Sequence, residues 1–408
     1  MRTTESFRGL YCTASDDQHD LTATGPTDAG GRLEPMYETS SIGWGTDPNA
    51  FERGSNTDTD TDTDTERNIT TRSMWRYEEL LPFVDPITAG EGDTPLVTAP
   101  QLAAEVGVET LAIKDESRNP TGTILDRGLS SAVTAARETD AELLALATPG
   151  NAGQSAAAYA GMAGLRSYAF VPSRTPFSNK AMVNVHGSEM RVAGGRYPDA
   201  EDALTEQLQS DWYTLQEFDN PYRHDGIKTV AFELAEAHEW SVPDAVVVPA
   251  GTGEIVAGVA KGFRELNDAN ILTAMPQLYA AQPSGCAPIA DAAADNAGTV
   301  EPWENPDTIV GELEIPDPNG GTAALEAIEE CNGEIITVDD DAILEAAVVA
   351  AQHAGLEIGT AGGAAIAAVD KLADRDVFDS TDTVIAVNTE SGTKTADVLR
   401  SHLMGKGI

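Results

Sequence analysis

The 408-residue chain has few basic side chains, few cysteines and no long apolar run. Lys and Arg total 25 against 67 Asp and Glu, and the formal net charge of -42 opposes binding to nucleic acid and to anionic membranes. Cys12, Cys286 and Cys331 are too few and too scattered for a disulfide framework, which favours a reducing, cytoplasmic compartment. Neither a membrane-spanning stretch nor the apolar core of a signal peptide is present. We therefore expect no nucleic-acid partner and no membrane partner.

The acidic residues are spread through well-patterned segments as well as being clustered. This distribution is typical of the surfaces of salt-adapted, halophilic proteins and differs from that of an acidic interaction tail. Hydrophobic residues make up 41% of the chain, which is enough to build sizeable cores. The composition therefore predicts a salt-adapted globular protein.

The first seventy residues differ from the rest of the chain in having little apolar periodicity. They end in "SNTDTDTDTDTERN", whose alternating Asp and Thr can bury nothing and predict a solvated linker. We divide the chain into an N-terminal segment (1–40), an acidic flexible linker (41–70) and a main region (71–405).

The main region alternates short apolar runs with alanine-rich helical stretches, as in "ELLALAT", "NAGQSAAAYAGMAG" and "SYAFVP". This alternation indicates β-α-β units around a parallel sheet. A second series begins at "DAVVVPA" and ends at "DTVIAVNT". The fold class is therefore α/β, with two doubly wound parallel-sheet domains and a cleft between them.

Two glycine-containing turns, "TPGNAGQS" and "PAGTGEIVAG", each follow a strand and open a helix. The backbone N–H groups of the second turn and the dipole of its helix could hold a phosphate, although an ordinary tight turn has the same pattern. In the first, Asn151 could present its amide at the edge of the sheet or simply cap a helix. Ligands of open α/β sheets collect at these strand ends, so the pair is more suggestive than either turn alone.

Six segments of the main region stand out by their order in the chain: "GEGDTPL", "IKDESRNPTGTILDRG", "TPGNAGQSAAAYAGMAG", "NPYRHDGIKTVAFELA", "VVVPAGTGEIVAGVAKGFREL" and "VNTESGTKTADVL". In this order they resemble the landmarks of threonine synthase, a member of the tryptophan-synthase-β-like (fold type II) family of pyridoxal-phosphate enzymes. The resemblance extends over roughly residues 75 to 400, and ordered landmarks are more specific than a single glycine turn.

The resemblance implies pyridoxal phosphate between two α/β domains and the conversion of O-phosphohomoserine into threonine. In the family, the lysine of "NPTGSFKDRG" forms a Schiff base with the cofactor and shuttles protons. Aligning the flanking NPTG and DRG places Leu125 at that position. Leucine has no nucleophile and no titratable group, so the covalent role and the acid–base role are lost together.

The resemblance also assigns the other residues of the cofactor site. Asn151 matches the asparagine that binds the pyridoxal 3′-oxygen, and Thr389 matches the hydroxyl residue that faces the pyridine nitrogen. After Thr389, however, "ESG" replaces the usual "GHG". Lys114, Lys180 and Lys228 lie in segments where the family also carries lysine, so we expect salt-bridge or surface roles for them.

The phosphate loop departs from the family pattern. Gly251, Thr252 and Gly253 match the glycine-rich run, but Glu254 stands where a further glycine is usual. A carboxylate beside a phosphate dianion is repulsive by roughly several kcal/mol at low dielectric, unless it turns away or is protonated. Pyridoxal phosphate is therefore the cofactor expected from the family, and its binding by this chain is in question.

At the N-terminus, "LYCTASDDQHD" and "GPTDAGGRLEPMYE" resemble the two knuckles of the zinc ribbon that precedes some archaeal threonine synthases. Of the expected cysteines only Cys12 remains, opposite Ser15, Pro26 and Ala29. One thiolate cannot make a four-ligand zinc site, so this degenerate ribbon predicts no metal. We expect residues 1 to 65 to contribute little apolar surface to the main fold and to be removable without its loss.

Two classes of function remain open. The first is a threonine synthase-like, pyridoxal-phosphate-dependent lyase whose catalysis is impaired by Leu125. The second is a non-catalytic paralogue that binds or regulates, with a small anionic metabolite or an intact homologue as its partner. The expected ligand is an amino acid or a phosphorylated amino acid, and the chain could form a homodimer or pair with the homologue. The joint loss of the lysine, the loop glycine and the ribbon cysteines favours the second class.

Overall fold

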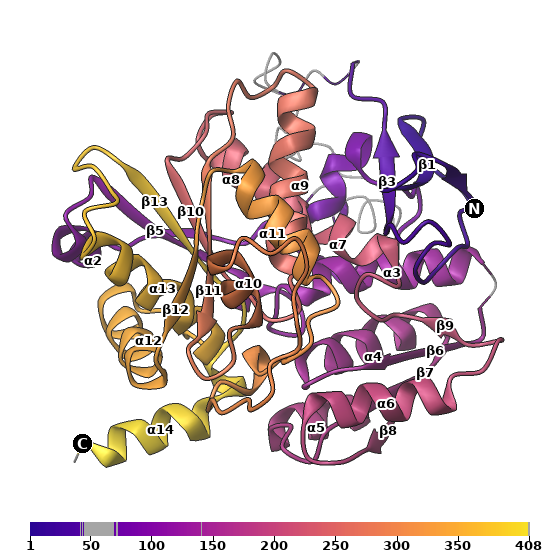
Figure 1. The fold of residues 1–408 in the computed structure, drawn as a ribbon. Helices are drawn as coiled ribbons and strands as arrows, with labels where there is room; N and C mark the ends of the chain where they lie inside the picture. The colour runs from indigo at the N-terminus through magenta and orange to yellow at the C-terminus, as the bar shows by residue number, and fades with distance from the viewer. Residues whose placement is uncertain (41, 43, 45–68, 71, 140, 407–408) are drawn as a thin grey trace, which may run out of the picture.

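The computed structural model of the chain describes residues 1–40, 42, 44, 69–70, 72–139 and 141–406 (Figure 1). Most of the predicted acidic linker, residues 41–70, lies outside this part of the chain. The described strands form three sheets, of six, four and three strands. The two larger sheets lie in the two α/β halves that the sequence predicts.

The four inner strands of the six-stranded sheet are mainly apolar runs that are buried on both faces. Its strand order is β12 (Ile335–Val338), β11 (Gln277–Pro283), β10 (Ala245–Pro249), β13 (Thr383–Asn388), β5 (Thr110–Asp115) and β4 (Leu96–Thr98). Neighbouring strands are parallel from β12 to β5, whereas β4 pairs with β5 in the antiparallel sense. The prediction of parallel sheets is therefore wrong for this one edge strand. An antiparallel edge on a parallel sheet is common in large α/β folds.

Helices cover both faces of this sheet because alternate strand residues point to opposite sides. Val246 and Val248 of β10 pack into one core cluster, while Val247 packs into the other. The first cluster includes residues of α8 (Thr229–Ala237), α9 (Glu254–Asp268), α10 (Pro288–Ala294) and α11 (Gly321–Glu330). The second includes residues of α2 (Pro100–Val106), α12 (Asp340–Ala354) and α13 (Thr360–Ala373), with α14 (Ala396–Gly405) against its edge.

The four-stranded sheet is entirely parallel. Its order is β8 (Glu189–Val192), β7 (Arg166–Val171), β6 (Leu143–Ala147) and β9 (Tyr213–Thr214). Helices α3 (Leu125–Glu138), α4 (Asn151–Ala163) and α5 (Phe177–Val185) pack on one face, and α6 (Tyr197–Gln207) packs on the other. Helix α7 (Pro221–Ile227) contacts both α3 and α9, which lie in different halves of the molecule (Figure 1).

The N-terminal residues form an antiparallel sheet in the order β2 (Gln18–His19), β1 (Phe7–Cys12) and β3 (Leu33–Tyr37). Phe7 and Leu10 are buried in the first core cluster, and the ring of Phe7 lies 6.5 Å from that of Tyr222 in α7. The expectation that this segment contributes little apolar surface is therefore wrong. Strands as short as these show too little apolar periodicity to be recognised in the sequence, so the buried residues of this segment were not predicted.

Polar contacts also join the N-terminal sheet to the main region. The hydroxyl of Tyr37 donates a 2.6 Å hydrogen bond to Asp225, and Nζ of Lys228 lies 3.8 Å from the Tyr37 ring centre. Nζ of Lys261 donates to the carbonyl of Pro35 at 2.9 Å. Cys12 is buried, and hydrogen bonding to Thr27 and Ser15 lowers the pKa of its thiol to about 7. The N-terminal sheet is therefore an integral part of the larger half.

Lys114, Lys180 and Lys228 have the salt-bridge and surface roles that the sequence predicts for them. Lys114 forms an ion pair with Glu233 at 2.6 Å. Lys228 pairs with Asp225 at 2.8 Å, and Lys180 donates to a backbone carbonyl at the surface. Salt-bridge and surface roles are thus confirmed for all three.

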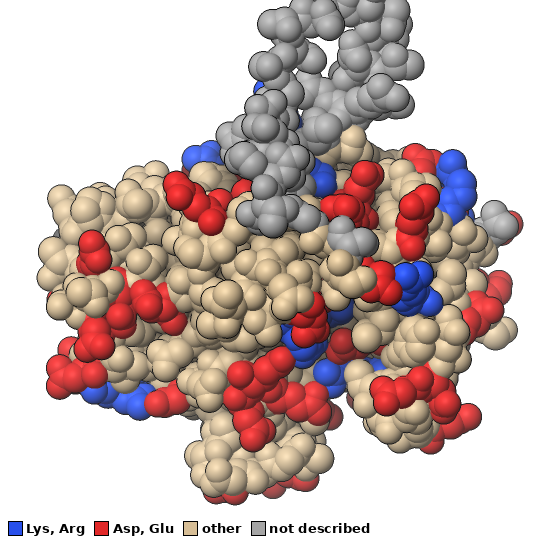
Figure 2. All heavy atoms as spheres, turned by 90° about the horizontal axis from the view of Figure 1, so that it is seen from above, with Lys and Arg blue, Asp and Glu red and all other residues tan. Residues whose placement is uncertain are grey.

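Acidic side chains are scattered over the face shown in Figure 2, where basic side chains are fewer. Among the described residues, no helix is long and apolar enough to cross a membrane. Within the same residues, no group of three or more His, Cys, Asp or Glu side chains is placed to hold a metal ion. The absence of zinc itself stays a prediction.

Candidate functional site

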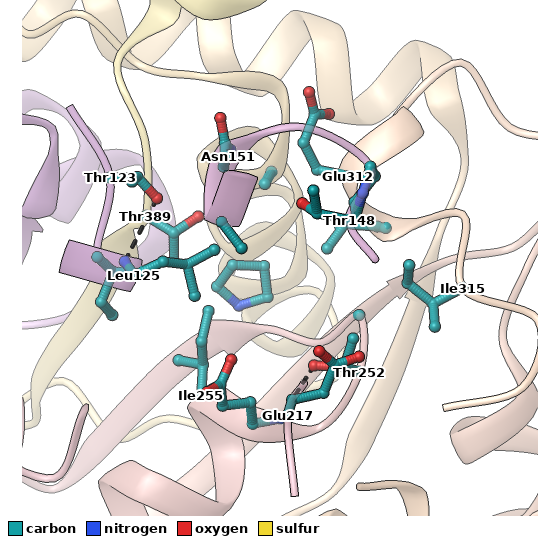
Figure 3. A pocket seen from close by; sticks show the side chains of 18 of the residues that line it. Thr123, Leu125, Thr148, Asn151, Glu217, Thr252, Ile255, Glu312, Ile315 and Thr389 are labelled. Carbon is teal, nitrogen blue, oxygen red and sulfur yellow. Dashed lines mark hydrogen bonds between the residues drawn. The ribbon is translucent and has the colours of Figure 1, made fainter. Parts of the chain in front are cut away.

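A cleft with a cavity volume of about 80 Å³ lies between the two larger sheets, at the carboxyl ends of their strands (Figure 3). The turns after β6, β10 and β13 all reach it, as does the start of α3. Described residues that line it are Thr123, Ile124, Leu125, Ala147, Thr148, Pro149, Asn151, Ala152, Tyr197, Glu217, Arg223, Pro249, Gly251, Thr252, Gly253, Glu254, Ile255, Glu312, Leu313, Ile315, Ala361 and Thr389. All the sequence-predicted site residues are among them.

Leu125 is the first residue of α3 and faces the cleft beside Thr123 and Thr389 (Figure 3). Its backbone N–H donates a 3.4 Å hydrogen bond to the hydroxyl of Thr123. The next residue, Asp126, accepts from the backbone N–H and the hydroxyl of Thr121, both at 2.6 Å, and this fixes the turn into the helix. Burial raises the pKa of Asp126 to about 6. None of the described residues that line the cleft is a lysine.

Asn151 begins α4, but its side chain does not cap the helix, because the N-cap residue is Gly150. Its Nδ2 donates to the carboxyl of Glu390, and its Oδ1 accepts from Nδ2 of Asn179 at 3.1 Å. The capping alternative left open by the sequence is therefore wrong. Thr389 follows β13, and its carbonyl accepts a 2.9 Å hydrogen bond from the N–H of Ile124.

The turn of Gly251, Thr252 and Gly253 leads into α9 at the floor of the cleft. Gly253 has φ of +89°, and a Cβ there would lie 2.4 Å from the carbonyl oxygen of Gly320. This glycine is therefore required by the backbone and by packing, as in an ordinary tight turn. The first N–H groups of a helix have no intrahelical partner, so the turn also presents the positive end of α9 to the cleft.

Glu254 does not face this turn as an isolated charge. Its two carboxylate oxygens accept hydrogen bonds from Nε and Nη2 of Arg223, at 2.8 Å and 2.7 Å. Nη1 of Arg223 also donates to Glu217 at 3.3 Å and to the carbonyl of Leu215 at 2.7 Å. Burial raises the pKa of Glu254, and Arg223 opposes that shift. Arg223 and Glu217 were missed in the sequence, because Arg223 meets Glu254 only across 31 positions and no local motif marks its contact with Glu217.

The charged side chains among the described lining residues are three glutamates, Glu217, Glu254 and Glu312, and one arginine, Arg223. Behind Asn151, burial and the neighbouring Glu312 raise the pKa of Glu390 to about 8. Burial likewise raises the pKa of Glu312. Carboxyl groups therefore predominate in the polar part of the described wall, and its one guanidinium is already engaged by two of them.

Residues 87–390 match the model of the pyridoxal-phosphate-dependent enzyme family. This chain belongs to that family. Similar family members include the threonine synthase of Methanosarcina acetivorans, 35% identical over 321 residues that cover 78% of this chain and 79% of that one. The threonine synthase of Methanocaldococcus jannaschii is 32% identical over 328 residues, covering 79% and 81%. The resemblance found in the landmarks is thus confirmed.

Two solved structures share the fold. Diaminopropionate ammonia lyase from Escherichia coli in complex with D-serine superposes with a TM-score of 0.68 at 18% identity, covering 78% of this chain and 88% of that one. Maize serine racemase has a TM-score of 0.63 at 21% identity, covering 77% and 94%. At these identities the likeness shows the fold alone.

The family implies pyridoxal phosphate, but the cleft residues do not fit an imine-bound cofactor. The described lining offers no primary amine, since Leu125 stands at the start of α3. At the α9 turn, the guanidinium of Arg223 is held by Glu254 and Glu217. Lys394, the nearby buried lysine, is not part of the lining and donates to Gln154 at 2.8 Å.

The raised pKa of Glu390 predicts a loss of stability as the pH rises. Its folded pKa of about 8 exceeds the ordinary value of 4.5, so the folded chain binds the extra proton and loses this advantage between these values. Burial lowers the pKa of His224 to about 3, so its opposing contribution is complete above about pH 6.5. We expect Glu390→Gln to reduce the loss of unfolding free energy between pH 6.5 and 8 by about 1–2 kcal/mol.

Urea unfolding at the two pH values and constant high salt measures this difference. Glu142→Gln is the matched control, because it removes one carboxylate from an exposed position. An identical pH dependence in the Glu390 and Glu142 variants would show that Glu390 titrates normally.

Proposed function

We propose that this chain is a threonine synthase-like protein that has kept the two-domain fold and ligand cleft of its family but does not perform imine-dependent chemistry. The observation that carries the proposal is the side chain of Leu125, which lines the cleft where the family pattern has its lysine. When bound, pyridoxal phosphate supplies an electron sink for carbanion chemistry, and a protein amine must hold it and move protons. Leucine can do neither.

On this proposal the cleft is a binding site for an amino-acid-type ligand. The lining provides apolar walls at Pro149, Pro249 and Ile315, together with carboxylates that can receive an ammonium group. A phosphorylated ligand fits less well, because the described lining carboxylates outnumber the single guanidinium of Arg223. Binding would serve regulation, either alone or in a pair with an intact homologue.

Retained lyase activity is the second candidate. It is favoured by the 35% identity to a threonine synthase and by the retention of Asn151 and Thr389 in the cleft. Conversion of O-phosphohomoserine in the presence of pyridoxal phosphate and high salt separates the candidates. The proposal predicts no turnover above a protein-free control, together with calorimetric binding of one or more amino acids. Threonine formation proportional to protein concentration would refute it.

The ion pair of Glu254 makes a further prediction in a background that contains Leu125→Lys. Removing Glu254 frees the guanidinium of Arg223 and removes a carboxylate from the α9 turn. We expect Leu125→Lys with Glu254→Gly to bind pyridoxal phosphate about tenfold more tightly than Leu125→Lys alone, because a like-charge contact is relieved. Spectroscopic titration measures the two affinities.

The variant Glu254→Gln in the same background is the control for shape, since it removes the charge and keeps the side-chain volume. It should bind at least as tightly as Leu125→Lys alone. Equal affinity in all three proteins would mean that Arg223 already neutralises Glu254 fully in the bound state.

A further inference from the structure

A second cavity, with a volume of about 120 Å³, lies beside the cleft. Pro149, Tyr197 and Glu312 line both, so a group bound in this side cavity is next to one bound in the cleft. The half with the four-stranded sheet contributes the loop after β7 and the start of α6 to its wall. The other half contributes η3 (Gly311–Leu313) and the start of α14. The side cavity is therefore lined from both halves, as the cleft is.

Two arginines share one carboxylate in the side cavity. Arg174 and Arg196 both line it, and Nη1 of each contacts the carboxyl of Glu314, at 3.2 Å and 2.5 Å. Glu314 is 6% exposed, whereas the side chains of Arg174 and Arg196 are 52% and 39% exposed. Burial raises the pKa of Glu312, the other carboxyl of the described lining, and favours its neutral form. The side cavity therefore has a local excess of positive charge.

This balance is the reverse of that in the cleft. There the guanidinium of Arg223 is held by two carboxylates, those of Glu254 and Glu217. The whole chain has 25 Lys and Arg against 67 Asp and Glu, so an anion is repelled over most of its surface. The paired arginines make the side cavity a place where an anion is attracted.

Three helices begin at the side cavity. Pro176, Arg196 and Thr395 line it and are the N-cap residues of α5, α6 and α14. The N–H groups of a first helical turn have no intrahelical partner, and the helix dipole is positive there. At α6 the carboxylate of Asp199 accepts from the N–H of Arg196 at 2.9 Å, whereas the first turn of α5 has no acidic residue. The start of α5 therefore adds to the positive potential of the cavity.

A buried hydroxyl of the same wall has no partner. Thr175 lines the side cavity and is 5% exposed, and its Oγ1 has no hydrogen-bond partner among the described residues. A buried hydroxyl without a partner is unfavourable, because its bonds to water are not replaced. This unpartnered group, independently of the arginines, indicates a polar ligand atom in the side cavity.

We propose that the side cavity is a binding site for an oxyanion, the phosphate or carboxylate group of a small ligand whose remaining part lies in the cleft. Arg174 and Arg196 supply charge-assisted hydrogen bonds, and Thr175 donates its hydroxyl hydrogen. The site is separate from the cleft wall, whose carboxylates disfavour a phosphate. The inference rests on the proposed function only in placing the rest of the ligand in the cleft.

The ion pairs with Glu314 leave room for such a ligand. A guanidinium has five N–H donors, and the contacts with Glu314 use Nη1 of Arg174 and Nη1 of Arg196. The remaining donors can bind a ligand oxygen while Glu314 stays in place. Glu314 nevertheless lowers the affinity, because its charge opposes a second anion at the same guanidiniums.

The test titrates inorganic phosphate into the full-length protein by calorimetry, at a high and constant concentration of potassium chloride. We expect one phosphate to bind per chain, with about tenfold weaker binding in Arg174→Gln and in Arg196→Gln, because each change removes a charge-assisted contact. Arg166→Gln is the matched control and should leave the affinity unchanged. Arg166 is exposed at the start of β7, the end opposite to the one that Arg174 follows.

Acetate identifies the kind of oxyanion. It carries one charge, so we expect it to bind about tenfold more weakly than phosphate and to lose affinity in the same arginine variants. Tighter binding of acetate than of phosphate would support the site and assign it to carboxylate ligands.

Glu314→Gln separates an anion site from a purely structural ion pair. If the arginines served only to join the two halves, removing their partner would loosen the cavity and weaken phosphate binding. We expect the opposite, about tenfold tighter binding, because a competing charge is removed and the side-chain volume is kept. Weaker binding in Glu314→Gln, unchanged binding in Arg174→Gln, or no saturable binding of either anion to the unmodified chain would overturn the inference.

These outcomes are distinct from a failure of the proposed function. Imine formation or turnover by the unmodified chain would refute the proposed function, whereas inorganic phosphate and acetate form no imine and report on the side cavity alone.

Discussion

Replacing Leu125 by lysine is expected to give the chain a reducible covalent link to pyridoxal phosphate that the unmodified protein lacks. The new amine would stand at the first position of α3, in the same cleft as Asn151 and Thr389. The positive end of the helix dipole disfavours the ammonium form there, which increases the fraction of reactive neutral amine. We expect a near-visible absorption band and, after borohydride reduction, close to one pyridoxyl group per chain at saturating cofactor.

Leu125→Met is the matched control, since methionine is similar in volume to leucine and has no amine. It should show neither the band nor the label. Mass mapping of the reduced protein must place the adduct on residue 125. A folded Leu125→Lys protein without label would show that residue 125 cannot reach the cofactor in the cleft.

Deleting residues 1–40 is expected to lower the free energy of unfolding by roughly 5–9 kcal/mol, because three large apolar side chains lose their burial. Phe7, Leu10 and Leu33 are buried, and burial of each such side chain contributes about 1.5–3 kcal/mol. The deletion also removes the hydrogen bond from Tyr37 to Asp225 and the carbonyl that accepts from Lys261. Chemical denaturation in high salt measures the loss, and at this magnitude part of the protein will be unfolded or aggregated in buffer.

A smaller change serves as the control for this deletion. Tyr37→Phe removes only the hydroxyl that donates to Asp225, and it should cost about 1–2 kcal/mol. If the truncated chain unfolds at the same denaturant concentration as the full chain, the N-terminal sheet is a dispensable cap after all.

The sequence predicted the two α/β halves and the cleft because both depend on local patterns. Strand, glycine turn and helix follow one another at Asn151 and at Gly251, and parallel strands bring both turns to one edge. The start of α3 at Leu125 could likewise be predicted from the local sequence around it. These placements therefore need no knowledge of distant contacts.

The polar wall of the cleft could not be predicted in this way. Arg223 meets Glu254 from 31 positions away, and Asn151 meets Glu390 from 239 positions away. No local periodicity marks such pairs, and Glu254 was interpreted as a bare charge for that reason. The apolar contribution of the N-terminal sheet was underestimated for the same reason. Phe7 and Leu10 are buried against residues that are distant in the sequence.

The most direct test of the central claim is borohydride reduction of the unmodified, full-length protein with excess pyridoxal phosphate in high salt, followed by peptide mass mapping. Because leucine stands at position 125 in place of an imine-forming lysine, we expect only low, scattered labelling of surface lysines. The extent of this labelling should equal that of a denatured sample of the same protein. Stoichiometric labelling of one buried lysine, such as Lys394, would contradict it.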